Sequence, residues 1–194
     1  MPRDAYHHGD LKAAAVAEAE RLIELDPDFS VRQLAGQLGV AHRALYNHFG
    51  DRAGLLAQLA AGGFRQLAAA TAESDSPAGF ITAYARFALA RPRLYQLMMA
   101  QPYPAFEQEP DLRAAADRLI AVALAVLAPA ASDAETGRRQ VMRHWMLVHG
   151  GLALHGGGVL RGRDDAGFIA ELLAIAGLAP PQPEPPQPIW EPHA

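Results

Sequence analysis

The sequence predicts an all-α protein, and three observations carry that prediction. Of the 194 residues, 51% are hydrophobic, and the prominence of alanine and leucine with few β-branched runs favours helices throughout. Apolar residues recur three and four positions apart, which is the period of a half-buried helix. Helix-capping side chains, glycines and prolines divide the chain into segments of helical length.

The first two helices are marked by signals at their ends. An opening helix is expected from Leu11 to Leu25. Ser30 then precedes an apolar-periodic run and has Gln33 three residues later, which is the capping-box pattern for a helix start. Gly39 can adopt the left-handed conformation that ends a helix. We therefore expect a second helix between Ser30 and Gly39.

A third, short helix follows, and its two sides differ. Leu45 and Phe49 are four apart and should face inward. The other side carries an imidazole, a cation, a phenol and an amide, the side-chain types that contact phosphates and base edges. These residues are His42, Arg43, Tyr46 and Asn47. The pattern is that of a helix-turn-helix, with an ordinary helical hairpin as the alternative.

Further helices are expected along the rest of the chain. Ser76 followed by Pro77 marks one start, because the hydroxyl can cap the helix and proline fits its first position. Three prolines between Gln101 and Pro110 indicate a loop, and seven in residues 180–194 indicate an extended or disordered tail. The expected helices are Asp51–Ala72, Pro77–Ala90, Arg93–Ala100, Asp111–Ala128, Asp133–His155 and one from Asp164 or Asp165 to near Gly177.

Composition and charge narrow the possible functions. The chain has no cysteine, and its histidines are not spaced to hold one metal ion, so we expect no metal and no cofactor. No apolar run has the length of a membrane span, so we expect no membrane partner and a cytoplasmic location. The net charge is −4, yet Phe29 to Arg65 contains four arginines and one acid, Asp51. A local positive patch on an acidic body suits sequence-specific DNA binding.

The N-terminal features resemble a known family. From Tyr6 to Gln66 the chain resembles the DNA-binding domain of TetR-family transcriptional repressors. The matching pieces are the Ser30-led helix, Gly39-Val40, Leu45-Tyr46-x-His48-Phe49 and Asp51-Arg52-x-x-Leu55-Leu56. Three positions depart from the family pattern: Ala41 replaces serine, Arg52 replaces lysine and Asp26-Pro27-Asp28 replaces a Gly-rich link.

This resemblance implies a domain division and a set of DNA contacts. Residues 1–50 would form the helix-turn-helix domain, which binds double-stranded operator DNA, and residues 51–72 a connecting fourth helix. Tyr46 and His48 would hold phosphates. His42 and Arg43 would reach base edges. The full expected set is Ser30, Arg32, His42, Arg43, Tyr46, Asn47, His48 and Arg52.

The C-terminal half carries a second, looser resemblance. Trp145 with His149-Gly150, and the segment Arg91–Met98, are similar to a TetR subgroup named for a Trp-His-Gly signature. The resemblance implies that residues 73–179 form a helical effector-binding and dimerisation domain. Aromatic and methionine side chains there would either fill the core or border a cavity for a small, largely apolar effector. The expected effector-binding residues are Tyr84, Phe87, Tyr95, Met98, Met99, Tyr103, Phe106, Trp145 and His149.

The expected protein is a homodimeric repressor that a small molecule releases from its operator. Its last two helices, 133–155 and 164–175, would pair with their copies, so a charge at Leu152 or Leu172 would separate the two chains. No enzyme activity is expected. Two alternatives stay open: a ligand-independent or architectural DNA-binding protein, and a helical enzyme with a fused DNA-binding head.

Overall fold

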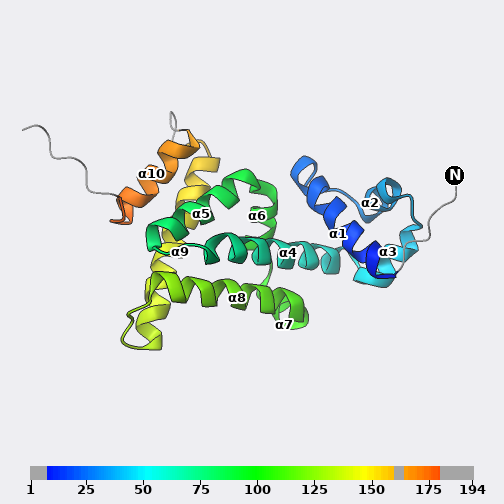
Figure 1. The fold of residues 1–194 in the computed structure, drawn as a ribbon. Coiled ribbons are helices and arrows are strands. Elements are labelled where there is room, and N and C mark those ends of the chain that lie inside the picture. The colour runs from blue at the N-terminus through cyan, green and yellow to red at the C-terminus, as the bar shows by residue number, and fades with distance from the viewer. Residues whose placement is uncertain (1–7, 160–163, 180–194) are drawn as a thin grey trace, which may run out of the picture.

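The computed structural model describes residues 8–159 and 164–179, and within these ranges the chain forms helices and no strand (Figure 1). The all-α prediction is therefore confirmed. The Pro-rich segment 180–194 lies outside the described residues. The helices are α1 (His8–Leu25), α2 (Val31–Leu38), α3 (His42–Phe49), α4 (Arg52–Ala72), α5 (Pro77–Ala90), α6 (Pro92–Met99), α7 (Tyr103–Gln108), α8 (Pro110–Leu127), α9 (Ala134–Gly156) and α10 (Asp165–Ile175).

Helices α1, α2 and α3 pack on one another as a three-helix unit, called the head below. Leu34 of α2 and Leu45 of α3 are fully buried in its core. The capping box is present: Ser30 Oγ accepts from the Gln33 N–H at 3.1 Å, and Gln33 Oε1 accepts from the Ser30 N–H at 2.7 Å. Gly39 has a φ of 65° and ends α2, so the chain can turn into α3.

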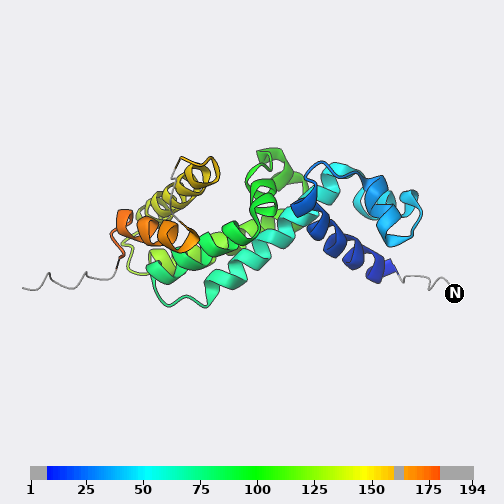
Figure 2. The ribbon, with the colours of Figure 1, turned by 90° about the horizontal axis from the view of Figure 1, so that it is seen from above.

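Helix α4 links the head to the remaining helices, called the body below. Both views show it running from the head into the body beside α8 (Figures 1 and 2). Helix α6 approaches α4 closely at Gly63, where an added Cβ would lie 2.5 Å from Met98 Sδ. A larger residue there would force the Met98 side chain to move.

Polar contacts fix α1 to the body. The Glu24 carboxylate accepts from the backbone N–H of Leu94 at 2.9 Å and of Arg93 at 3.2 Å, so a residue of α1 caps the first turn of α6. Gln66 of α4 donates to Glu20 of α1 at 3.0 Å. The orientation of the head is thus tied to both α4 and α6.

Helices α9 and α10 lie at the end of the molecule farthest from the head (Figure 1). Helix α10 packs on α5 and α9 through Phe168 and Leu172, which are 0% and 2% exposed. A Cβ added at Gly151 of α9 would lie 2.5 Å from Leu172. Leu172 therefore belongs to the core of its own chain, and the expectation that it lies at a surface between two copies is wrong.

The helix boundaries match the sequence prediction to within three residues, with one exception. The segment expected to be a loop contains α7. Its Pro104 occupies the second position of the helix, where a missing N–H costs no intrahelical hydrogen bond, so proline permits a helix start there. None of the helices in the described residues is long and apolar enough to cross a membrane.

Candidate functional site

Helix α3 presents one polar face to the solvent, called the reading face below. Leu45 and Phe49 are 0% and 8% exposed and anchor α3 in the head. The opposite side is exposed, and on it the rings of His42 and Tyr46 meet edge to face at 4.6 Å. The four predicted residues on this face are His42, Arg43, Tyr46 and Asn47, and all are exposed.

The other four predicted DNA-binding residues surround this face in different settings. Ser30 and Arg32 are exposed at the start of α2, although the Ser30 hydroxyl already serves as the helix cap. His48 is half-buried, with its ring centroid 6.3 Å from that of Phe49. Arg52 donates through Nη2 to the Pro27 carbonyl at 3.2 Å and through Nε to the Phe29 carbonyl at 3.4 Å. Their DNA contacts stay predictions.

Arg52 thus has a local role that its sequence position did not reveal. Its two carbonyl partners lie in the link between α1 and α2, 23 and 25 residues away along the chain. A guanidinium has five N–H donors, so these contacts leave three for other partners. Ala41 makes no side-chain cap at the start of α3, as its methyl side chain dictates.

The body contains a cavity of about 560 Å³, bordered by helices α4 to α9. Six of the nine predicted effector-binding residues line it: Tyr84, Met98, Met99, Tyr103, Phe106 and Trp145. The other three, Phe87, Tyr95 and His149, do not line it. A cavity therefore lies where the aromatic and methionine side chains predicted one, while its use by an effector stays a prediction.

One wall of the cavity is a stripe along α8 that the sequence analysis did not identify. The stripe begins at Arg113 and ends at Leu127, and its spacing of three and four residues marks a single helix face. Fourteen residues of helix span about 21 Å, so the cavity is elongated. This periodic pattern is visible in the sequence, but a core-facing helix shows the same one. The α8 residues that line the cavity are Arg113, Ala116, Asp117, Leu119, Ile120, Ala123 and Leu127.

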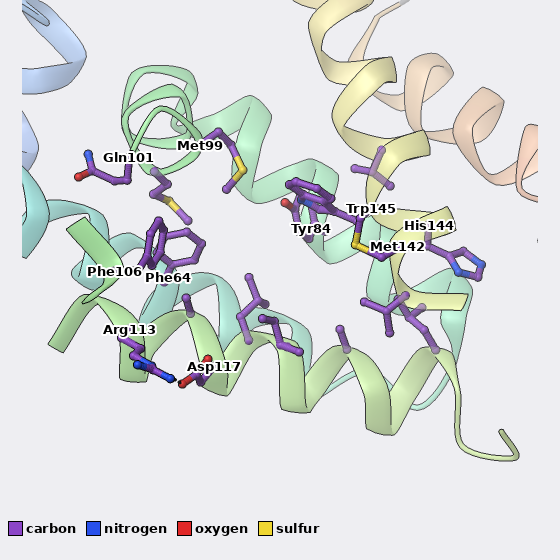
Figure 3. A pocket seen from close by; sticks show the side chains of 18 of the residues that line it. Phe64, Tyr84, Met99, Gln101, Phe106, Arg113, Asp117, Met142, His144 and Trp145 are labelled. Carbon is purple, nitrogen blue, oxygen red and sulfur yellow. Dashed lines mark ion pairs between the residues drawn. The ribbon is translucent and has the colours of Figure 1, made fainter. Parts of the chain in front are cut away.

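The two ends of the cavity differ in polarity (Figure 3). At the α7 end, Arg113 and Asp117 form an ion pair of 3.8 Å, and both side chains are 67% exposed. Phe64 of α4 and Phe106 of α7 meet edge to face there, with centroids 6.2 Å apart. The α9 end is bordered by Met142, His144 and Trp145. Between the ends the lining is mainly apolar.

Tyr95 and His149 lie behind the cavity wall and continue a hydrogen-bonded chain from Tyr84. The Tyr84 and Tyr95 hydroxyls are 3.3 Å apart, and the Tyr95 hydroxyl is 3.0 Å from His149 Nδ1. The indole of Trp145 stacks on the His149 ring at 5.7 Å. Burial raises the pKa of both tyrosines, so both hydroxyls stay protonated at neutral pH.

A family comparison assigns the body. Residues 78–175, about half of the chain, match the family model described as tetracyclin repressor-like, C-terminal domain. The chain belongs to the TetR family. This family consists of transcriptional regulators, so the chain is a regulator of the TetR type. The match does not single out the Trp-His-Gly subgroup, which stays a prediction.

Two solved structures resemble this TetR-family chain over almost its whole length. One is a protein with unknown function from Rhodococcus sp. RHA1, which is 30% identical with a TM-score of 0.71, over 92% of this chain and 100% of that one. The other, SCO4313, is provisionally described as a regulatory protein and is 26% identical with a TM-score of 0.65, over 91% and 100% of the two chains. No curated protein matches the sequence.

Proposed function

We propose that this TetR-family regulator is a cytoplasmic repressor that a small apolar molecule releases from its operator DNA. The observation that carries the proposal is the double role of α4. This helix starts three residues after the end of α3 and also borders the cavity through Phe64. Any ligand that moves Phe64 therefore acts on the element that positions the reading face.

The mechanism is a shift between two populations. In one, α4 and α6 hold the head where the reading face can enter a major groove. In the other, an occupied cavity displaces α4, and the ligand favours this form because it binds it more tightly. Reciprocity requires that operator DNA weaken ligand binding by the same factor.

Two copies are needed for this mechanism, and exposed apolar faces on α9 and α10 support a homodimer. Helix α9 exposes small and apolar side chains at four-residue and three-residue spacing, and α10 exposes alanines every fourth residue. Two such helices from each copy would form a four-helix interface. Its two heads would lie about 34–36 Å apart to enter successive major grooves. The exposed residues are Met146, Gly150, Ala153 and Leu154 of α9, and Ala166, Ala170, Ala174 and Ile175 of α10.

The test begins with selection of a bound DNA sequence from a random pool. Fluorescence anisotropy then measures its affinity for the full chain with and without each member of a set of hydrophobic compounds. We expect a twofold-symmetric site, and at least one compound that weakens DNA binding and raises the melting temperature of the protein. DNA binding that no cavity ligand alters would favour the ligand-independent regulator. Failure to select any sequence would contradict a DNA-reading role.

A further inference from the structure

We propose that the Tyr84 hydroxyl is the polar anchor of the cavity, and that it accepts a hydrogen bond from the ligand. The ligand would then be a largely apolar molecule that carries one O–H or N–H group. This inference rests on the proposed effector role of the cavity and adds the chemical class of the effector. The supporting observation is the series of hydrogen bonds that joins Tyr84, Tyr95 and His149 behind the cavity wall.

This series of hydrogen bonds joins three helices of the body. Tyr84 of α5 is 4% exposed, Tyr95 of α6 is 6% exposed, and their hydroxyl oxygens are 3.3 Å apart. His149 of α9 follows at 3.0 Å from the Tyr95 hydroxyl. Trp145, one helical turn before His149, stacks on the His149 ring. Of these four residues only Tyr84 and Trp145 line the cavity (Figure 3).

The direction of the protons along this chain follows from donor satisfaction. If Tyr84 donates to Tyr95 and Tyr95 donates to His149 Nδ1, every hydroxyl proton in this series has an acceptor. In the reverse direction the Tyr84 proton would point away from Tyr95, where the described residues give it no hydrogen-bond acceptor. That arrangement leaves a buried O–H donor unsatisfied, which costs more than an unused lone pair.

The favoured direction determines what the cavity offers to a ligand. The Tyr84 oxygen has two lone pairs. They are the remaining hydrogen-bonding capacity of this hydroxyl, since its proton is engaged with Tyr95. A ligand hydroxyl or amine can donate to one of them. A ligand carbonyl or ring nitrogen would instead meet another acceptor and be rejected.

Tyr95 and His149 are therefore positioning residues that act through Tyr84. Neither residue lines the cavity, yet Tyr95 accepts the hydrogen bond that Tyr84 donates, and His149 accepts the one that Tyr95 donates. Removal of the Tyr95 hydroxyl frees the Tyr84 proton, so Tyr84 could then donate as well as accept. If Tyr95 and His149 only filled space, replacing them would not change whether the cavity prefers ligands that donate a hydrogen bond or ligands that accept one.

The test uses calorimetric titration of the full chain at pH 8 with three bicyclic probes of similar size. 1-Naphthol can donate a hydrogen bond, isoquinoline can only accept one, and 1-methylnaphthalene can do neither. Tyr84→Phe and Tyr95→Phe are the test variants. Tyr46→Phe is the control, because it also removes one tyrosine hydroxyl but Tyr46 is exposed on the head and does not line the cavity. Melting curves establish that each variant is folded.

We expect the wild-type protein to bind 1-naphthol about fivefold more tightly than 1-methylnaphthalene, the effect of one net hydrogen bond. Tyr84→Phe should remove this preference, and Tyr46→Phe should keep it. Tyr95→Phe should raise the affinity for isoquinoline, because the Tyr84 proton becomes available. A preference that survives in Tyr84→Phe, or wild-type binding of isoquinoline above that of 1-naphthol, would overturn the inference.

These ligand titrations, together with anisotropy measurements of operator affinity in the presence of 1-naphthol, separate this inference from the proposed function. If the probes bind without preference, the cavity takes apolar ligands but Tyr84 is not the anchor. If 1-naphthol is preferred but DNA affinity does not change, the anchor stands and the release mechanism fails. If no probe binds the wild-type protein, both proposals are contradicted.

Discussion

At the scale of single residues, Arg43 and Arg52 illustrate two settings for the same side chain. Arg43 lies exposed on the reading face, one residue into α3. Arg52 is also exposed, but it bonds two carbonyls of the link between α1 and α2. We therefore expect Arg43 to affect which DNA sequence is bound, and Arg52 to affect how strongly any sequence is bound.

Replacement of Arg43 by alanine should weaken binding to the selected operator by about 1–3 kcal/mol, the range for a bidentate contact with guanine. The difference in binding free energy between the wild-type protein and the variant should be smaller for operators altered at the base that Arg43 contacts, because the variant no longer distinguishes bases at that position. Anisotropy titrations against single-base operator variants measure this. Arg118→Ala is the control, since Arg118 is exposed on α8 in the body. An equal loss on every operator variant would assign Arg43 to a phosphate instead.

Replacement of Arg52 by alanine should weaken binding to all sequences alike and reduce the slope of log affinity against log salt by about one unit. Arg52→Lys keeps the charge but loses the forked donor, so it should retain the salt slope. Titrations between low and moderate salt provide the slopes, and melting curves report the lost carbonyl contacts. An unchanged slope with a lowered melting temperature would mean that Arg52 only fixes the link.

At the scale of helices, α6 connects the head to the cavity. Its N-terminal turn is capped by Glu24 of α1, and its C-terminal part borders the cavity through Met98 and Met99. Eight residues of helix span only about 12 Å, so the two contacts are close together. Since α4 packs against the same helix, the head rests on two elements that both border the cavity.

Replacement of Glu24 by alanine should lower the free energy of unfolding by about 1 kcal/mol, because the first turn of α6 loses its cap. Urea denaturation followed by circular dichroism measures the difference. Glu18→Ala is the matched control on the same helix: Glu18 pairs with Arg21 in an exposed i,i+3 ion pair, so a smaller effect is expected. Equal losses in the two variants would mean that the cap of α6 contributes nothing beyond helix propensity.

At the scale of the whole molecule, the body has two apolar surfaces of different kinds. The cavity surface lies between helices of one chain, whereas the α9 and α10 surface faces outward. Leu154 and Ile175 are 48% and 61% exposed on that outward surface. We assign the first to a ligand and the second to a second copy of the chain.

Leu154→Glu and Ile175→Glu should therefore convert a dimer into folded monomers with reduced operator affinity, since each copy would then bind one half-site alone. Sedimentation velocity at micromolar concentration measures the mass. Leu124→Glu is the control, because Leu124 is 37% exposed but lies on α8 and does not line the cavity. Leu172→Glu should instead lower the melting temperature, as Leu172 is buried within its own chain. A wild-type protein that sediments as a monomer would contradict the dimer.

Features that depend on local contacts were predictable from the amino-acid sequence. Helix starts were predictable because a capping side chain bonds a backbone N–H only three residues away, as at Ser30, Ser76 and Asp133. The two sides of α3 were predictable because four-residue spacing places Leu45 and Phe49 on one face. The mistaken loop at α7 came from reading Pro104 as a breaker, although proline fits the first turn of a helix.

Which predicted side chains share a site depends on how the helices pack, and the sequence pattern does not reveal it. The cavity is bordered by parts of six helices, and its outline depends on their packing angles and not on any local pattern. Tyr95 and His149 are 54 residues apart, and they contact each other directly behind the wall and not in the cavity itself. Arg52 reaches back 25 residues to Pro27 for the same reason. Short-range spacing fixes the face of a helix, whereas the packing of that face against others decides what it contacts.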